Sequence, residues 1–327
     1  MVRLTVENRK WWILATMTGA LSMVLIDETV VSVALPAIQR DLHMSQTGLQ
    51  WVVNAYLLAL ASCVAAGGRL GDLFGQARMF RLGALVFVAA SAGCGLAQSQ
   101  AWIIAARAVQ GLGAAVMIPA TGTIVINAFH VRERGRVMGI YAGSSMISLA
   151  LGPLLGGLLT QLISWRAVFW VNLPLGLSML ALAAVTLPAD EPERGASMDW
   201  RGALTLVPGL LMIVLAVMQS QQWGWNSAAT ITLLAAGAAL ITVFALSEPR
   251  RRSPLVQLAL FRNRNFPADG AVLGLVQFAL TGLTVFGTIY VQELLGFGPV
   301  AGGASLLPVM LPLLLVSPLA GPCSTVG

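Results

Sequence analysis

The stretch that decides the fold is residues 204–218, LTLVPGLLMIVLAVM, an apolar run without a single charge. A strand of a membrane barrel would alternate polar and apolar residues, and this run does not. Similar runs of about 20 residues recur from end to end, which is the length of a helix that crosses a bilayer. A lipid-exposed backbone of this kind satisfies its amides internally only as a helix. The sequence therefore predicts an all-α polytopic membrane protein.

Composition supports this interpretation and excludes others. The chain has 327 residues, of which 57% are hydrophobic and 10% charged, and its mean hydropathy is +0.82. A soluble domain carries about 25% charged residues, and disordered chains are more polar still. The net charge of +6 comes from short basic clusters between apolar runs, without the basic and aromatic patch expected of a nucleic-acid protein. We therefore expect a lipid bilayer, and no nucleic acid, as partner.

Charge and turn residues divide the chain into ten candidate spans. These are 11–36, 47–68, 79–97, 102–126, 137–162, 167–187, 202–219, 228–246, 266–290 and 301–319. Two longer polar connections, 188–201 and 248–265, separate the spans into groups. We expect a six-helix bundle in 1–187, an extra transmembrane hairpin in 202–247, and the first two helices of another bundle in 266–327.

The basic residues predict the orientation of these spans. With the N-terminus in the cytoplasm, 16 of the 19 lysines and arginines fall on the cytoplasmic side, while only Arg40 and Arg166 lie outside and Arg107 lies within a span. Cytoplasmic loops carry an excess of Lys and Arg. The sequence thus predicts a multi-pass membrane protein with its N-terminus in the cytoplasm, and we expect the inner (plasma) membrane as its location.

Two charged residues inside apolar spans are the first candidates for function. An ionised Asp27 at lipid depth is disfavoured unless it faces water or a partner, so we expect it to bind a proton readily. The alternative is a structural carboxylate near the kink at Pro36. Arg107 shares a helix face with Gln110, three residues on, and needs an acceptor that the sequence does not identify. A pair between Asp27 and Arg107 is one of the options.

Two glycine-rich segments complete the candidate site. Residues 67–78, GGRLGDLFGQAR, form the expected cytoplasmic loop between the second and third spans, where glycines permit a tight turn and Asp72 can cap a helix. The fifth span holds Gly152, Pro153, Gly156 and Gly157, whose small side chains allow close helix packing and whose proline can bend the helix.

The sequence lacks the motifs of several common catalytic and cofactor-binding sites. The chain carries no ATP-binding loop, no metal-ligand cluster and no catalytic Ser/His/Asp set, and its two histidines lie in opposite loops. We therefore expect no enzyme activity, no cofactor and no metal. Energy for any transport would come from an ion gradient.

These motifs resemble the major facilitator superfamily. Gly68, Gly71, Asp72, Gly75 and Arg78 match its cytoplasmic signature, with Leu73 and Gln76 in place of the usual basic residues. Residues 27–36, DETVVSVALP, residues 107–114, RAVQGLGA, and residues 152–157, GPLLGG, are similar to motifs of the fourteen-span drug:proton antiporters of the EmrB/QacA type.

The resemblance implies a function and an architecture. It implies proton-coupled efflux of small hydrophobic or cationic compounds such as drugs, with Asp27, Arg107 and Gln110 in proton coupling and the fifth-span glycines at a seam between two six-helix halves. Four helices of the second half are then absent, so we expect a C-terminal truncation. The alternative is an inactive remnant, or a partner-dependent membrane scaffold without transport activity.

Overall fold

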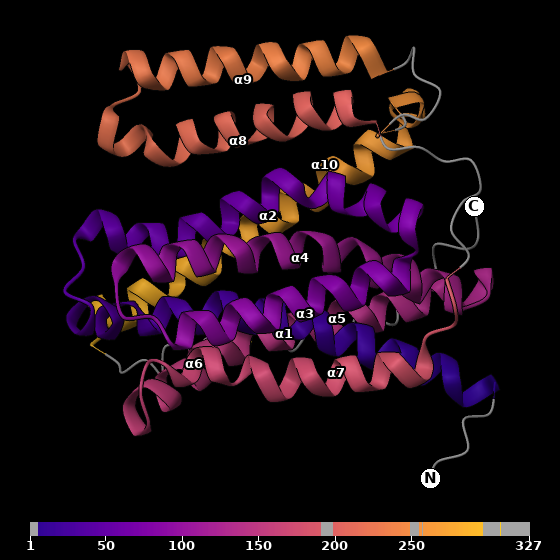
Figure 1. Ribbon diagram of the computed structural model, residues 1–327, viewed down its shortest axis with the longest axis horizontal. Helices are drawn as coiled ribbons and strands as arrows, with labels where there is room; N and C mark the ends of the chain where they lie inside the picture. The colour runs from indigo at the N-terminus through magenta and orange to yellow at the C-terminus, as the bar shows by residue number, and fades with distance from the viewer. Residues whose placement is uncertain (1–5, 191–198, 249–254, 257, 297–307, 309–327) are drawn as a thin grey trace.

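The structure, a computed structural model, describes residues 6–190, 199–248, 255–256, 258–296 and 308 (Figure 1). Every long element in these residues is a helix. The α-helices are α1 (Val6–Asp41), α2 (Gln46–Phe74), α3 (Gln76–Gly95), α4 (Gln100–Ala128), α5 (Val131–Leu162), α6 (Ala167–Trp170), α7 (Asn172–Thr186), α8 (Trp200–Trp223), α9 (Ala228–Ser247) and α10 (Asn265–Ile289). Two short helices, η2 (Leu258–Arg262) and η3 (Tyr290–Leu294), flank α10.

The helices coincide with the predicted spans. Among the described residues, 8 helical segments are long and apolar enough to cross a membrane, with α6 and α7 together forming the sixth. They correspond to the first eight of the ten predicted spans, which confirms an all-α polytopic membrane protein. Helix α10 forms where the ninth span was predicted. The tenth, 301–319, lies outside the described residues except for position 308.

Helices α1 to α7 pack side by side as one bundle. Helix α4 packs against both α2 and α3, and α1 packs against α5 and α7. The α8–α9 pair lies along one edge of this bundle and reaches it through α8, which contacts α2 (Figure 1). Serine or aspartate side chains cap the first turns of several helices, namely Ser45, Ser99, Asp199 and Ser227.

Polar contacts join the helix ends on both sides of the bundle. On the side that carries most of the basic residues, here called the basic side, Lys10 forms an ion pair with Glu133 at 2.8 Å. On the opposite side, Arg166 forms an ion pair with Asp41 at 2.7 Å. These contacts place the start of α1 beside the start of α5, and the end of α1 beside the start of α6. Successive helices therefore run in alternating directions, as a multi-pass membrane protein requires.

The bundle core consists of two hydrophobic clusters with a polar layer between them. Along α1, Met23 and Val24 belong to the first cluster, and Val30 and Val31 belong to the second. Asp27 lies between these pairs and is 0% exposed. The buried carboxyl group of Asp27 thus sits where the two apolar clusters meet.

A buried carboxyl group closes the basic side of the α8–α9 hairpin. Glu248 follows the last residue of α9, is 1% exposed, and accepts a hydrogen bond from the Val256 amide at 2.8 Å. Desolvation by burial raises the pKa of Glu248 above its usual value of 4.5, and the nearby Asp199 carboxylate adds to this effect, while the Val256 hydrogen bond opposes it.

Stability of the hairpin should therefore depend on Glu248. Because its folded-state pKa is raised, the folded protein holds this proton more tightly, and the associated stability is present below pH 4.5 and lost as pH rises through the raised pKa. We expect Glu248→Gln to remove this loss, so that its melting temperature exceeds that of the unaltered chain at neutral pH but not at pH 4. Thermal unfolding in detergent measures both, and a constant difference at the two pH values would contradict the prediction.

Candidate functional site

The centre of the candidate site is an ion pair between α1 and α4. Arg107 Nη1 lies 2.6 Å from Asp27 Oδ2, and the two side chains are 1% and 0% exposed. The sequence predicted that each charge would need a partner and left the partner open. The structure brings these two residues together across the polar layer of the core.

Each member of the pair has further hydrogen-bonding partners. Asp27 Oδ1 accepts from Gln110 Nε2 at 2.9 Å and from Asn172 Nδ2 at 2.6 Å. Arg107 donates to Gln110 Oε1 at 2.8 Å and to the Val52 carbonyl at 3.0 Å. The shared face predicted for Arg107 and Gln110 is confirmed by this contact. Both charges are therefore compensated, as buried ions must be.

An aromatic ring completes the surroundings of the guanidinium. The Cζ atom of Arg107 lies 4.2 Å from the centroid of the Tyr56 ring, close enough for a cation–π interaction. Tyr56 comes from α2 and is fully buried. Its hydroxyl has no hydrogen-bond partner among the described residues. The site is thus bounded by α1, α2, α4 and α7.

Asn172 reaches this site from the first residue of α7, in the sixth span. Helix α6 ends at Trp170, α7 begins at Asn172, and Val171 lies between them. Val171 keeps helical dihedral angles, with φ at −62° and ψ at −28°. Pro174 lacks the amide that would bond to the Trp170 carbonyl, so one helix hydrogen bond is missing at this point. Sequence analysis did not single out Asn172. A usable signal was present, because it is a polar amide two residues before a proline in an otherwise apolar run.

The glycines of the fifth span face α1. A Cβ atom at Gly152 would collide with the Thr29 side chain, and one at Gly156 would lie 2.8 Å from the Val30 carbonyl oxygen. Pro153 and Gly157 are buried as well. The resemblance placed this glycine face at a seam between two halves of the protein. In the described residues, Gly152 and Gly156 allow α1 and α5 to approach each other within the first bundle. A role at the seam stays a prediction.

Gly156→Ala should therefore destabilise the protein. The added methyl group meets backbone atoms of α1, which cannot move without separating the two helices, and overpacking of this kind costs about 1–3 kcal/mol. Gly122→Ala is the matched control, because nothing lies within 4 Å of the corresponding Cβ position in α4. We expect thermal unfolding in detergent to show a lower melting temperature for Gly156→Ala only. Equal melting temperatures would contradict the close packing.

The structure corrects the predicted loop at residues 67–78. Helix α2 continues through the charged segment to Phe74, and α3 begins at Gln76, so the connection is Gly75 alone. Gly75 has a φ of 99°, which side chains other than glycine rarely adopt. Gly68 and Gly71 lie inside α2. Of the glycines in this motif, Gly75 thus forms the predicted turn.

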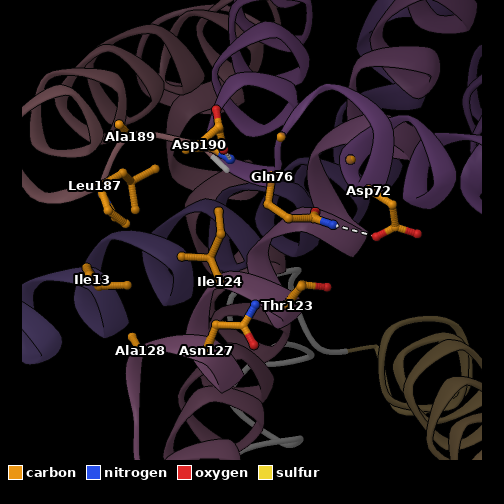
Figure 2. Close-up of a pocket in the computed structure, with 14 residues that line it drawn as sticks. Ile13, Asp72, Gln76, Thr123, Ile124, Asn127, Ala128, Leu187, Ala189 and Asp190 are labelled. Carbon is orange, nitrogen blue, oxygen red and sulfur yellow. Dashed lines mark hydrogen bonds between the residues drawn. The ribbon is translucent and has the colours of Figure 1, made fainter. Parts of the chain in front are cut away.

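Asp190, rather than Asp72, caps the neighbouring helix. Its two carboxylate oxygens accept hydrogen bonds from the backbone amides of Ala77 and Arg78, both at 2.8 Å, at the start of α3. Asp72 instead accepts from the Gln76 side chain at 2.9 Å (Figure 2). Asp190 belongs to the connection after α7 and was not singled out from sequence.

A cavity of about 510 Å³ lies beside this cap on the basic side (Figure 2). Ile13 and Ile124 line its apolar part, while Asn127, Asp72 and Asp190 supply polar groups. Its lining comes from α1, α2, α3, α4 and the connection after α7. The signature motif therefore forms part of a concave surface where five segments meet.

Asp190→Ala should lower the stability of the protein where these five segments pack together. Loss of a capping side chain costs about 0.5–2 kcal/mol, and here two backbone amides lose their acceptor. Asp72→Ala removes an exposed contact with Gln76 and an ion pair with Arg69 at 3.7 Å, and should change stability by less than about 0.5 kcal/mol. The melting temperatures of the two variants show which of the two aspartates caps α3. A larger effect at Asp72 would restore the capping role suggested by the sequence.

Comparison with known protein families gives one match over nearly the whole chain. The model of the Major Facilitator Superfamily matches residues 17–325. The tetracenomycin C resistance and export protein of Streptomyces glaucescens is 36% identical over 96% of this chain and 59% of its own length. The puromycin resistance protein of Streptomyces alboniger is 38% identical over 93% of this chain and 60% of its own length. The chain thus spans about three fifths of these relatives.

Solved structures show the same fold at low sequence identity. A proton:xylose symporter superimposes with a TM-score of 0.58 at 14% identity, covering 97% of this chain and 69% of that one. A peptide transporter bound to sulfate superimposes with a TM-score of 0.55 at 15% identity, covering 75% of this chain and 53% of that one. At this level of identity the likeness concerns the arrangement of helices alone.

Proposed function

Because the chain belongs to the Major Facilitator Superfamily, a family of membrane transporters, we propose that it exports small hydrophobic or cationic compounds by proton antiport. Relatives named for export or resistance to tetracenomycin C and puromycin support the export of drug-like molecules. We place the protein in the fourteen-span branch, with a cytoplasmic N-terminus and the inner membrane as its location. The clusters of arginine on the basic side support that orientation.

The observation that carries the proposal is the buried ion pair between Asp27 and Arg107. A buried pair contributes little net stability, because desolvation offsets most of the attraction. Ionisable residues inside membrane spans are rare and mark ion or proton pathways. We infer that this pair exists for proton transfer, with Asp27 as the group that gains and loses the proton.

Charge balance explains how a proton and a substrate could exchange. With Asp27 ionised, the pair has no net charge. With Asp27 protonated, Arg107 leaves one positive charge in a region of low dielectric constant, where a second cation is strongly disfavoured. A bound cationic substrate therefore favours release of the proton, and an incoming proton favours release of the substrate. Because one proton is exchanged for one monovalent cation, no net charge crosses the membrane, and the pH gradient drives this cycle.

Membrane vesicles test the coupling directly. We expect inside-out vesicles that contain the protein to accumulate tetraphenylphosphonium when their interior is made acidic. Nigericin with potassium collapses the pH gradient and should abolish this accumulation. Uptake that survives nigericin would contradict proton antiport. Absence of any uptake above that of vesicles without the protein would instead favour a membrane protein that does not transport.

A further inference from the structure

Asn172, in the sixth span, donates a hydrogen bond to Asp27, and its amide oxygen has no hydrogen-bond partner among the described residues. Its Nδ2 atom donates to Asp27 Oδ1 at 2.6 Å and to Ser91 Oγ at 3.0 Å. Its Oδ1 atom is buried and has no hydrogen-bond partner among the described residues. The side chain is 0% exposed, so water does not substitute for that partner at the surface. A buried orphan acceptor of this kind needs an explanation.

The hydrogen bonds around Asn172 fit only one protonation state of Asp27. An ionised carboxylate accepts and cannot donate, so the carboxamide must present its NH₂ group to Asp27. The same NH₂ group then serves Ser91, whose hydroxyl donates to the Phe169 carbonyl at 2.9 Å. The amide oxygen is left facing away from both partners. The orphan is therefore a consequence of the negative charge on Asp27.

Protonation of Asp27 would reverse this requirement. The new O–H group on Asp27 needs an acceptor, and the Asn172 oxygen supplies one if the carboxamide turns over about its Cβ–Cγ bond. The oxygen then also lies beside Ser91, whose hydroxyl can rotate and donate to it. The NH₂ group then takes the former place of the oxygen and gives up its hydrogen bonds to Asp27 and Ser91, while the only proton gained is the one that Asp27 binds.

We propose that Asn172 is a positioning residue for Asp27 whose carboxamide turns over when Asp27 takes up a proton. Ser91 then exchanges the Phe169 carbonyl for the Asn172 oxygen, which releases a tertiary hydrogen bond at the end of α6. Phe169 lies two residues before Val171, which separates α6 from α7. A change of one proton at Asp27 is thereby carried to a joint between two helical segments. This inference rests on the proposed proton-binding role of Asp27.

Carbodiimide labelling measures the proton on Asp27 without any transport. Dicyclohexylcarbodiimide reacts with protonated carboxyl groups in apolar surroundings, and mass spectrometry locates the adduct. A Glu28→Gln background leaves Asp27 as the single reactive carboxyl group in that part of α1. The pH of half-maximal labelling then reports the proton equilibrium of Asp27 in each variant.

Asn172→Leu should move the half-labelling pH upwards by roughly one to two units. The leucine cannot donate to the ionised carboxylate, and one hydrogen bond to a charged group is worth a shift of this size. Asn172→Asp is nearly isosteric, and its like charge should move the value in the same direction. Ser178→Ala, at an exposed position of the same helix, should leave it unchanged. A purely structural asparagine would lower the melting temperature and leave the half-labelling pH where it is.

Hydrogen exchange tests the relay through Ser91. Asp27→Asn is permanently neutral and can donate to the Asn172 oxygen, so it imitates the protonated state. We expect it to speed amide exchange in residues 167–174 by about threefold or more, because the Phe169 carbonyl is released. When Ser91 is replaced by alanine, amide exchange in residues 167–174 should be the same with aspartate or asparagine at position 27.

The outcomes separate this inference from the proposed function. Labelling of Asp27 that does not depend on pH in the unaltered chain would overturn the proton-binding role itself. Normal pH-dependent labelling, with no shift in either Asn172 variant, would overturn the positioning role alone. The relay would be overturned if Asp27→Asn speeds amide exchange in residues 167–174 by the same factor with serine and with alanine at position 91.

Discussion

Asp27→Asn is expected to abolish substrate export driven by a pH gradient, with uptake into inside-out vesicles falling at least tenfold. Asparagine has nearly the same size as aspartate and its oxygen can still accept from Arg107, so this variant loses the counter-charge of the guanidinium but keeps the hydrogen bond. It cannot bind or release a proton, and the exchange of proton for substrate stops. Tetraphenylphosphonium accumulation at an imposed pH gradient measures the effect.

Glu28→Gln is the matched control for this prediction. Glu28 is the next residue of α1, about 100° round the helix, and is only partly buried. It makes no ion pair with Arg107, which binds Asp27. We expect this variant to keep at least about half of the transport rate. Loss of transport in Glu28→Gln together with normal transport in Asp27→Asn would show that Glu28, and not Asp27, binds the proton.

Arg107→Gln is expected to cause the largest loss of stability. It leaves the Asp27 carboxylate buried without a counter-charge, and breaking a buried pair in this way costs about 3–5 kcal/mol. It also removes the hydrogen bond to the Val52 carbonyl and the contact with the Tyr56 ring. Thermal unfolding in detergent should show a melting temperature lower by roughly 5–10 °C.

The double variant Asp27→Asn with Arg107→Gln distinguishes charge from packing. With both charges removed, no ion remains uncompensated, and we expect most of the lost stability to return. Residues in direct contact show such non-additive effects, whereas independent ones do not. If the melting temperature of the double variant equals the sum of the two single effects, the pair is not coupled and the site described here is wrong.

Hydropathy predicted where the spans lie but not where the helices end. The second span was predicted to stop at Gly68, whereas α2 continues to Phe74 through Arg69 and Asp72. Arginine is a good helix former, so a charged residue does not by itself end a helix where the chain leaves the lipid. Loss of hydropathy therefore marks the edge of the apolar layer, and the helix itself ends where Gly75 adopts a positive φ.

The candidate site was predicted in part, because its residues come from distant positions. Arg107 and Gln110 are three residues apart on one helix, so their shared face follows from helix geometry. Asn172 and Asp27 are separated by 145 positions, and their contact depends on the packing of α7 against α1. No local pattern encodes such a contact. The same reason explains why Asp190, 113 positions from Ala77, was missed as the cap of α3.

The most direct test of the account is whether substrate binding releases a proton from Asp27. Purified protein in weakly buffered detergent, mixed with tetraphenylphosphonium, reports this through a pH-sensitive dye. We expect release that approaches one proton per protein at a pH where Asp27 is largely protonated, and none from Asp27→Asn that binds the same cation. Equal proton release from both proteins would contradict the central role of this carboxyl group.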